Sequence, residues 1–435
     1  MSPHAVPVPS ADDANELREQ FAVTCNAFLP EDSPSEILSD AYYSPWEAIA
    51  SNLPQLIDNG CIRSEVDQMP LLSTERLATD ADWRRAYVLL GFMTHAYVWG
   101  GETPEEILPP QVTVPFLKVS SHLELPPVLT YAAANLWNFK SSIDDFTDLS
   151  SLDTLVSFTG TESEAWFLLI SVAMEARGAD IIQTMVHALH AVKTRDYEVI
   201  TDALRRLADC IDGVGCLLDR MYEKCDPTTF YYRIRPFLAG SKNMAAAGLP
   251  RGVFYDEGDG KGEWRELRGG SNGQSSLIQF FDVVLGVDHH GNGADPKTTV
   301  EKEEKSFHAQ VREYMPGPHA RFLRHVAQIG NIRELALLPP KTEQQTRLRA
   351  AYTAATDSLA EFRNKHIRIV TRYIVIPSKQ HHNAQQPTSN NTKKNLATSS
   401  DALNKDEELT GTGGTALMPF LKQTRDETKR AGDLC

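Results

Sequence analysis

The chain has 435 residues, 41% of them hydrophobic, and carries a formal net charge of -15 with an isoelectric point near 5.4. This length can bury one large core or two domains. The acidic balance disfavours nucleic acids and anionic membranes as partners, because proteins usually bind both through a basic face. No segment approaches the roughly 18 uncharged apolar residues of a membrane-spanning helix, and no apolar signal-peptide region follows Met1.

The first half of the chain shows three segments of contrasting pattern. An apolar-rich helix is expected over 80–101, closed by a glycine pair. The proline-punctuated segment 109–127 predicts partly extended backbone, whereas 128–140 predicts a compact buried helix. The polar, turn-rich residues that follow favour a domain boundary near residue 155. We therefore expect a small N-terminal helical domain, 1–155, and a larger helical domain, 156–435.

The second half has more regular helical periodicity. Residues 163–196 predict one long helix or two abutting ones, with Gly178 as the break. Another strong helix is expected over 361–377, ended by Pro377. The polar stretch that follows favours a mobile loop over 378–411. Because few segments alternate with period two, the fold class is predicted to be all-α.

The six cysteines stand at positions 25, 61, 210, 216, 225 and 435, with no CxxC pair. Their spacing does not match a disulfide framework, which favours a reduced, cytoplasmic compartment. Cys216 and Cys225 lack partners at metal-ligand spacing, so a metal site there is the weaker interpretation.

His366 stands in an apolar stripe of the helix predicted over 361–377, between Phe362 and Ile369. A histidine on such a face is more often a hydrogen-bonded core residue than a ligand. The alternative is an iron ligand, since a neutral imidazole can bind haem iron through one nitrogen. Arg363, one turn earlier, could then reach a haem propionate or a nearby carboxylate.

Three other groups of residues admit two interpretations each. The segment "GGSNGQSS", 269–276, predicts either an anion-binding turn or a serine-capped loop-to-helix junction. Arg235, among aromatic and aliphatic neighbours, suits either a ligand carboxylate or a structural ion pair. His187 and His190 share one side of a helix without evident partner acids, so a structural role is favoured. His289 and its neighbour at 290 are expected to be loop residues.

The chain resembles the indoleamine 2,3-dioxygenase family, haem enzymes that open the indole ring of tryptophan. The similarity runs in the same order from about residue 40 to about residue 425. It is carried by the segments "LPQLIDNG", "AYVWG", "LELPPVLTYAAANLWNFK", "FLLISVAMEARGA", "RPFLAG", "GGSNGQSS", "FFDVVLG", "REYMPGPHARFL", "KHIRIVTRYIVIP" and "GTGGTALMPFLK". The resemblance implies a two-domain all-α fold with haem b held between the small and the large domain.

The resemblance also assigns roles to individual residues. His366 takes the place of the proximal iron ligand, with Arg363 and its acidic partner Asp282 on the same side of the haem. The other implied positions lie around the substrate and the far side of the haem. They are Tyr131, Ala134, Phe167, Leu168 and Ser171 in the distal wall, Phe230 against the indole, Arg235 on the carboxylate, Gly270, Ser271 and Asn272 beside the haem edge, and Thr412 in a lid.

The implied reaction inserts both atoms of O2 across the C2–C3 bond of L-tryptophan and gives N-formyl-L-kynurenine. This is the first step of the kynurenine pathway, which leads to NAD biosynthesis. No side chain is expected to act as an acid or base, an external reductant is required, and the chain is expected to be a monomer. The alternatives are an oxygen-binding haem protein on the same fold and a divergent dioxygenase with low tryptophan affinity. Leu168, Ala134, Asn135 and Asn272 depart from the family pattern and make the pocket wider or more polar.

Overall fold

The computed structural model describes residues 11–289, 307–383, 394–401 and 409–433. Its secondary structure is helical apart from five short strands among these residues. The elements before residue 160 are α1 (Ala11–Phe21), a 3-10 turn (Ala41–Tyr43), α2 (Ser44–Ser51), α3 (Leu53–Asp58), α4 (Ile62–Gln68), α5 (Asp80–Trp99), β1 (Ile107–Leu108), α6 (Pro110–His122), the π-helical turn η2 (Ala132–Leu136), β2 (Phe139–Ser141) and β3 (Leu152–Thr154).

The remaining elements include the longest helices. They are α7 (Glu162–Arg177), α8 (Ala179–Ala191), α9 (Tyr197–Asp219), α10 (Met221–Lys224), α11 (Pro227–Thr229), the π-helical turn η3 (Phe230–Ile234), α12 (Arg235–Leu238), β4 (Val253–Gly258), β5 (Lys261–Arg265), the 3-10 turn η4 (Asn272–Gln274), α13 (Ser276–Leu285), α14 (Phe307–Val311), the 3-10 turn η5 (Arg312–Tyr314), α15 (Gly317–Ile329), α16 (Ile332–Leu337), α17 (Glu343–Val370), the π-helical turn η6 (Thr371–Val375), α18 (Ile376–Asn383), α19 (Leu396–Asp401) and α20 (Leu417–Gly432).

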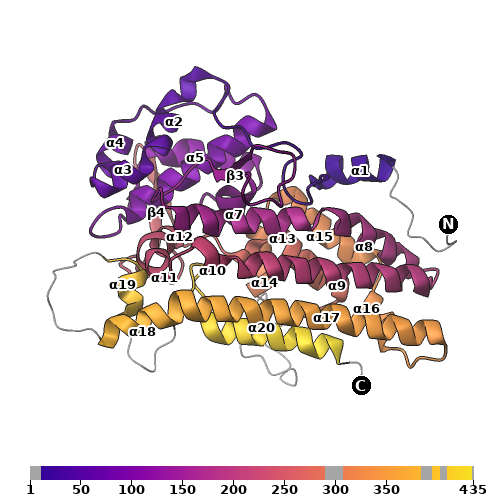
Figure 1. The fold of residues 1–435 in the computed structure, drawn as a ribbon. Coiled ribbons are helices and arrows are strands. Elements are labelled where there is room, and N and C mark those ends of the chain that lie inside the picture. The colour runs from indigo at the N-terminus through magenta and orange to yellow at the C-terminus, as the bar shows by residue number, and fades with distance from the viewer. Residues whose placement is uncertain (1–10, 290–306, 384–393, 402–408, 434–435) are drawn as a thin grey trace.

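Long helices run side by side through the larger part of the molecule. In Figure 1, α7, α9, α17 and α20 cross the view in nearly the same direction, and α2 to α5 lie above them. Helix α17 packs against both α9 and α20. The contact with α9 follows from sequence, because Leu204, Leu207, Ile211, Val214 and Leu218 recur every three or four residues and are buried on one face.

Helix α5 is buried on nearly all sides and forms the centre of the N-terminal part. Its start is fixed by a capping box, in which Thr79 accepts from the backbone of Asp82 and the Asp82 carboxylate accepts from the backbone of Thr79. Buried residues of the N-terminal part and of the long helices belong to one hydrophobic cluster. The domain boundary near residue 155 therefore stays a prediction.

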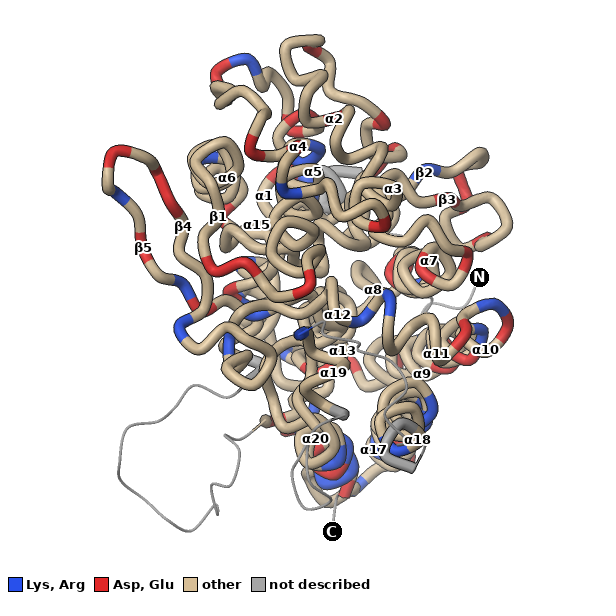
Figure 2. Tube along the Cα trace, turned by 90° about the vertical axis from the view of Figure 1, so that its left-hand side faces the viewer, with Lys and Arg blue, Asp and Glu red and all other residues tan. Residues whose placement is uncertain are grey.

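The strands form two small sheets. Strand β4 pairs in parallel with β1 and antiparallel with β5, and β2 pairs antiparallel with β3. The β4–β5 hairpin projects from the helical body in Figure 2. In the same view acidic and basic residues are interspersed along the elements. The predicted all-α class is confirmed, and no helix among the described residues is long and apolar enough to cross a membrane.

Gly178 separates α7 from α8, as the sequence predicted. A Cβ atom added at this glycine would lie 2.3 Å from Leu277 Cδ1, so the Leu277 side chain would have to move. The missing side chain lets Leu277 of α13 pack closely against the junction of α7 and α8.

Three local predictions were wrong. Residues 110–122 form α6 rather than extended backbone, because Val112, Phe116 and Val119 bury one helical face despite Pro115. Within 128–140 only the π-helical turn η2 is helical. Pro377 lies in the first turn of α18, which directly follows the π-helical turn η6, so the helical path continues beyond it.

The expected mobile loop, 378–411, contains secondary structure. Helix α18 extends to Asn383 and α19 covers Leu396–Asp401, while residues 384–393 and 402–408 lie outside the described residues, as do residues 1–10. Beyond them, Thr410 forms a bridge with Ala416, which closes a tight loop before α20.

Candidate active site

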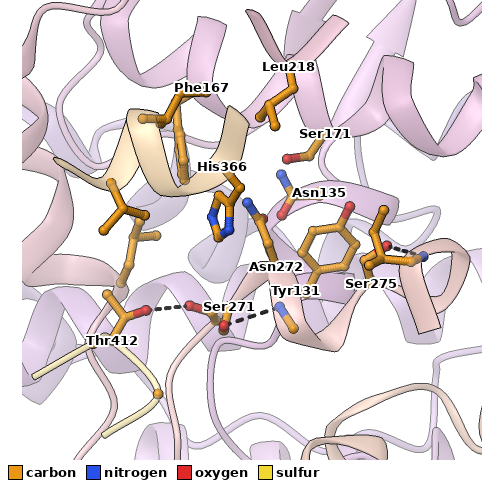
Figure 3. Close-up of a pocket in the computed structure, with 18 of the residues that line it drawn as sticks. Tyr131, Asn135, Phe167, Ser171, Leu218, Ser271, Asn272, Ser275, His366 and Thr412 are labelled. Carbon is orange, nitrogen blue, oxygen red and sulfur yellow. Dashed lines mark hydrogen bonds between the residues drawn. The ribbon is translucent and has the colours of Figure 1, made fainter. Parts of the chain in front are cut away.

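A cavity of about 210 Å³ opens where the long helices meet the segment 269–275. Its walls come from α7, α17 and α20, from the three π-helical turns, and from the loop at 411–415. Figure 3 shows the side chains that face it. Most of the lining side chains are apolar or aromatic, and polar side chains are interspersed among them.

His366 projects from α17 into this cavity (Figure 3). Burial and the nearby charge of Arg363 lower the pKa of the imidazole to about 4, so the ring is neutral at neutral pH. Within the described residues the ring makes no hydrogen bond, so it is not a hydrogen-bonded core histidine. A neutral imidazole with a nitrogen facing an apolar cavity is suited to ligate a metal.

Arg363 and Asp282 form the ion pair that the sequence predicted. Nη2 of Arg363 donates to both carboxylate oxygens of Asp282, at 2.6 and 2.8 Å, and both side chains are less than a tenth exposed. Nη1 of Arg363 is buried and has no hydrogen-bond partner in the described part of the chain. Since Arg363 also lines the cavity, this nitrogen can bind an anionic group placed there.

These observations fit a haem. The cavity offers one neutral histidine, apolar walls that include Leu218, Ile369 and Leu421, and a buried arginine with a remaining donor for a propionate. The described part of the chain holds no group of three or more His, Cys, Asp or Glu residues able to bind a metal ion. The weaker interpretations of His187, His190, Cys216 and Cys225 as metal ligands gain no support.

Three aromatic rings line a second part of the cavity. Phe167 of α7 and Phe230 of η3 have ring centroids 4.9 Å apart at 60°, and Phe230 meets Tyr373 of η6 at 5.7 Å and 87°. Such edge-to-face contacts fix the rings against one another. Together they form a rigid wall suited to a flat aromatic ligand.

Arg235 lies fully buried at the start of α12. Its Nη2 donates to the Thr410 carbonyl oxygen at 2.6 Å, and its guanidinium carbon lies 5.3 Å from the centre of the Tyr231 ring. Thr412 Oγ1 donates to the Gly270 carbonyl oxygen at 2.9 Å. Arg235 and the 411–415 loop therefore meet at one end of the cavity.

The segment 269–276 is a serine-capped junction that also lines the cavity. Ser271 caps η4, and Ser275 caps α13 by accepting from the Ile278 N–H at 3.2 Å. Gly269 is required by close packing, since a Cβ there would lie 2.1 Å from the Leu238 carbonyl oxygen. The serine-capped interpretation is confirmed, and the capped turn presents Gly270, Ser271 and Asn272 to the cavity. Anion binding by this turn stays a prediction.

A polar group that sequence reasoning missed occupies the opposite end. Glu175 is 1% exposed, and its Oε1 accepts from Tyr131 at 3.1 Å and from Ser275 at 2.5 Å. Its Oε2 is buried and has no hydrogen-bond partner among the described residues. Burial, opposed by those two hydrogen bonds, raises the pKa of Glu175 to about 7. The sequence did hold a signal for Glu175. It follows Ser171 by four residues, as Ser171 follows Phe167, so all three share one face of the helix.

The structure brings nearly every expected site residue to one cavity. All of the expected substrate and haem contacts, namely Tyr131, Ala134, Phe167, Leu168, Ser171, Phe230, Arg235, Gly270, Ser271, Asn272, Arg363, His366 and Thr412, line it. Asp282 lies behind the wall and acts through Arg363.

All three π-helical turns contribute to this cavity. Turn η2 provides Ala134 and Asn135, η3 provides Phe230, and η6 provides Tyr373 and Ile374. Each π turn holds one residue more than an α-helical turn and is common at functional sites. The backbone itself therefore helps to shape the pocket.

The fold and the cavity define an all-helical protein with a buried, histidine-lined pocket suited to haem. The sequence profile of the indoleamine 2,3-dioxygenase family matches residues 17–431, and the chain belongs to this family. Members of the family depend on haem, and the chain is an oxidoreductase of the dioxygenase type.

Relatives are similar over almost their whole length. The chain is 40% identical over 414 residues to the indoleamine 2,3-dioxygenase of Aspergillus nanangensis, covering 93% of this chain and 94% of that protein. It is 39% identical over 419 residues to the 6-hydroxytryptophan 2,3-dioxygenase of Fusarium equiseti, covering 96% and 98%. It is 38% identical over 426 residues to the indoleamine 2,3-dioxygenase of Saccharomyces cerevisiae, covering 94% and 92%.

Proposed function

We propose that the protein binds haem b through His366 and cleaves the C2–C3 bond of L-tryptophan with O2, giving N-formyl-L-kynurenine. The observation that carries this proposal is a single cavity that unites a neutral histidine, a pair of aromatic rings and a buried arginine. A haem site alone requires only the first of these features. The other two are complementary to an indole ring and an amino-acid carboxylate.

The haem, when bound, supplies the iron at which O2 is activated. The chain's own residues hold the reactants. His366 would ligate the iron, and Arg363, oriented by Asp282, would bind a propionate through Nη1. Apolar walls keep water from the reacting atoms.

Residues on the other side of the cavity would position the substrate. Phe167 and Phe230 would form one wall against which the indole packs, and Arg235 would bind the carboxylate with Thr412 beside it. Ser271 would contact the substrate from the capped turn, with Tyr131 and Ser171 in the distal wall. No acid–base group is assigned to the reaction.

A hydroxylated tryptophan is the second candidate substrate. Asn135 is 5% exposed and lines the cavity, and its Nδ2 donates to the Leu168 carbonyl oxygen at 3.0 Å. Because this bond uses the amide nitrogen of Asn135, its carboxamide oxygen remains as the acceptor for a ligand hydroxyl. Figure 3 shows Asn135, Ser171 and Tyr131 grouped on the side of the cavity away from Thr412. A ring hydroxyl would point toward this polar group while the carboxylate meets Arg235, and one relative is named for such a substrate.

We further propose that the enzyme acts in the cytoplasm as a monomer, with an external reductant. Its product would enter the kynurenine pathway toward NAD. Its acidic charge and its cysteine pattern support the compartment.

The first test is the absorption spectrum of the purified protein supplied with haem, recorded with L-tryptophan under air. We expect a Soret band and a growing N-formylkynurenine signal. His366→Ala should lose both, whereas His187→Ala on α8 should keep both. An oxygen-binding haem protein would bind O2 reversibly without forming product, and that result would refute the dioxygenase proposal. A wild-type protein without a Soret band would refute haem binding.

A further inference from the structure

His289 follows α13 and lies between two carboxylates from distant parts of the chain. Its Nδ1 is 2.7 Å from Oε2 of Glu427 on α20, and its Nε2 is 3.2 Å from Oδ2 of Asp282 on α13. The His289 side chain is 7% exposed, and both carboxylates are 4% exposed. Histidine and glutamate thus meet in the interior, 138 residues apart in sequence.

The two carboxylates at this contact favour a charged imidazole. An ionised carboxylate only accepts hydrogen bonds, and a neutral imidazole has a single N–H to donate. Nδ1 of His289 forms a hydrogen bond with Glu427 and Nε2 lies 3.2 Å from a carboxylate oxygen of Asp282, so an imidazolium is attracted to both acids. Burial alone would lower the pKa of His289, but the charge of Asp282 and the hydrogen bonds of both acids outweigh it and raise this pKa above its ordinary value.

The contact joins two walls of the proposed haem pocket. Asp282 also accepts both hydrogen bonds from Arg363, the candidate propionate ligand. Glu427 belongs to α20, whose residues Leu417, Leu421 and Thr424 line the cavity. A chain of charged contacts therefore runs from α20 through His289 and Asp282 to Arg363.

We propose that His289 is a positioning residue whose imidazolium, bound between Asp282 and Glu427, holds α20 in place and fixes the orientation of Arg363. The effect on haem rests on the proposed function, whereas the attachment of α20 does not. His289 lies in a loop, as predicted, and no family motif in the sequence pointed to its contact with Glu427.

Charged groups from four elements surround this contact. Asp282 comes from α13, Arg363 from α17 and Arg312 from η5, and Arg312 interacts electrostatically with Asp282. On α20, Arg430 lies 4.0 Å from Glu427, but it is largely exposed. Because the folded pKa of His289 is raised, its contribution is complete below pH 6.5, the ordinary value, and is lost as the pH rises through the folded pKa.

The test compares His289→Gln with His187→Gln, a histidine on α8 outside the site. Hydrogen–deuterium exchange is measured for the peptide covering α20 at pH 6, in the full chain with and without added haem. We expect roughly tenfold faster exchange of α20 in His289→Gln and no change in His187→Gln. The wild type should approach the variant as the pH rises. Equal exchange in His289→Gln and wild type, in both haem states, would overturn the proposal.

Two further measurements keep the inference distinct from a folding defect and from the proposed function. Glu427→Gln and the double variant complete a double-mutant cycle, in which the two effects should be strongly non-additive. Additive effects would show that His289 and Glu427 do not interact directly, which would overturn the proposal. Transfer of haem to excess apomyoglobin should be several-fold faster in His289→Gln, and an unchanged rate would overturn the link to Arg363. Wild type that binds no haem would instead refute the proposed function, while the exchange data would still decide the role of His289.

Discussion

Arg235 donates from Nη2 to the backbone carbonyl oxygen of Thr410 at 2.6 Å. Two residues later, Thr412 donates to the Gly270 carbonyl oxygen at 2.9 Å. The candidate carboxylate-binding arginine is thus in contact with the loop that closes one end of the cavity. Substrate binding at Arg235 and the position of this loop are therefore coupled through a direct hydrogen bond.

Arg235→Ala should reduce kcat/KM for L-tryptophan by about a hundredfold, since a buried charge-assisted hydrogen bond is worth roughly 1.5–3 kcal/mol. The kcat/KM for tryptamine, which has no carboxylate, should fall much less. Arg233→Ala is the matched control, because Arg233 is about half exposed and pairs with Asp58 at 3.5 Å. Steady-state kinetics on both substrates checks the prediction, and an equal loss on tryptamine and tryptophan would contradict it.

Asp282→Ala should destabilise the fold by about 3–5 kcal/mol, because it leaves Arg363 buried without its partner. Asp219→Ala provides the comparison. Asp219 pairs with Lys365 at 2.5 Å but is 43% exposed, so about 1 kcal/mol or less is expected. Urea unfolding at neutral pH measures both. Similar losses of unfolding free energy in the two variants would show that the Asp282–Arg363 ion pair is not buried in solution.

Glu175→Gln should change how stability depends on pH. With a folded pKa near 7, the native state holds the Glu175 proton more tightly than the unfolded chain, whose ordinary value is 4.5. The free energy of unfolding therefore falls as the pH rises from 4.5 through 7, by on the order of 3 kcal/mol. The variant should lack this decline and be the more stable protein at pH 8. Denaturant unfolding across pH 5–9 tests this, with the exposed Glu65→Gln as control.

Asn135→Val should lower kcat/KM for 6-hydroxytryptophan about tenfold while changing that for L-tryptophan little. The variant removes the acceptor for a ring hydroxyl and leaves the aromatic wall of Phe167 and Phe230 unchanged. L-Tryptophan serves as the internal control. Parallel changes on both substrates would show that Asn135 acts on the pocket shape and not on the hydroxyl.

Helical periodicity predicted the second half of the fold well. The break at Gly178 and the all-α class followed from spacing and composition. The errors fell where packing outweighs local preference. Apolar burial keeps α6 helical around Pro115, and Pro377 begins α18 instead of ending a helix. Neither outcome is encoded in the neighbouring residues alone, because both depend on what packs against the segment.

The site was predictable only in part for a related reason. Resemblance placed His366, Arg363 and Asp282 together, and the structure confirmed the contact between the last two. Glu175 and the pairing of His289 with Glu427 were missed. Ser275 lies 100 residues from Glu175 and Glu427 lies 138 residues from His289, so the neighbouring sequence does not reveal these two contacts.

The three π-helical turns make the pocket sensitive to residue number as well as residue identity. Deleting one residue from η2, η3 or η6 would let the turn relax toward an α-helix. Because each residue of a helix advances its side chains by about 100°, a single deletion would reorient the side chains around the deleted position. Insertions and deletions in these turns should therefore be tolerated far less than substitutions. The number of residues in each turn should constrain the enzyme more strictly than their side-chain types.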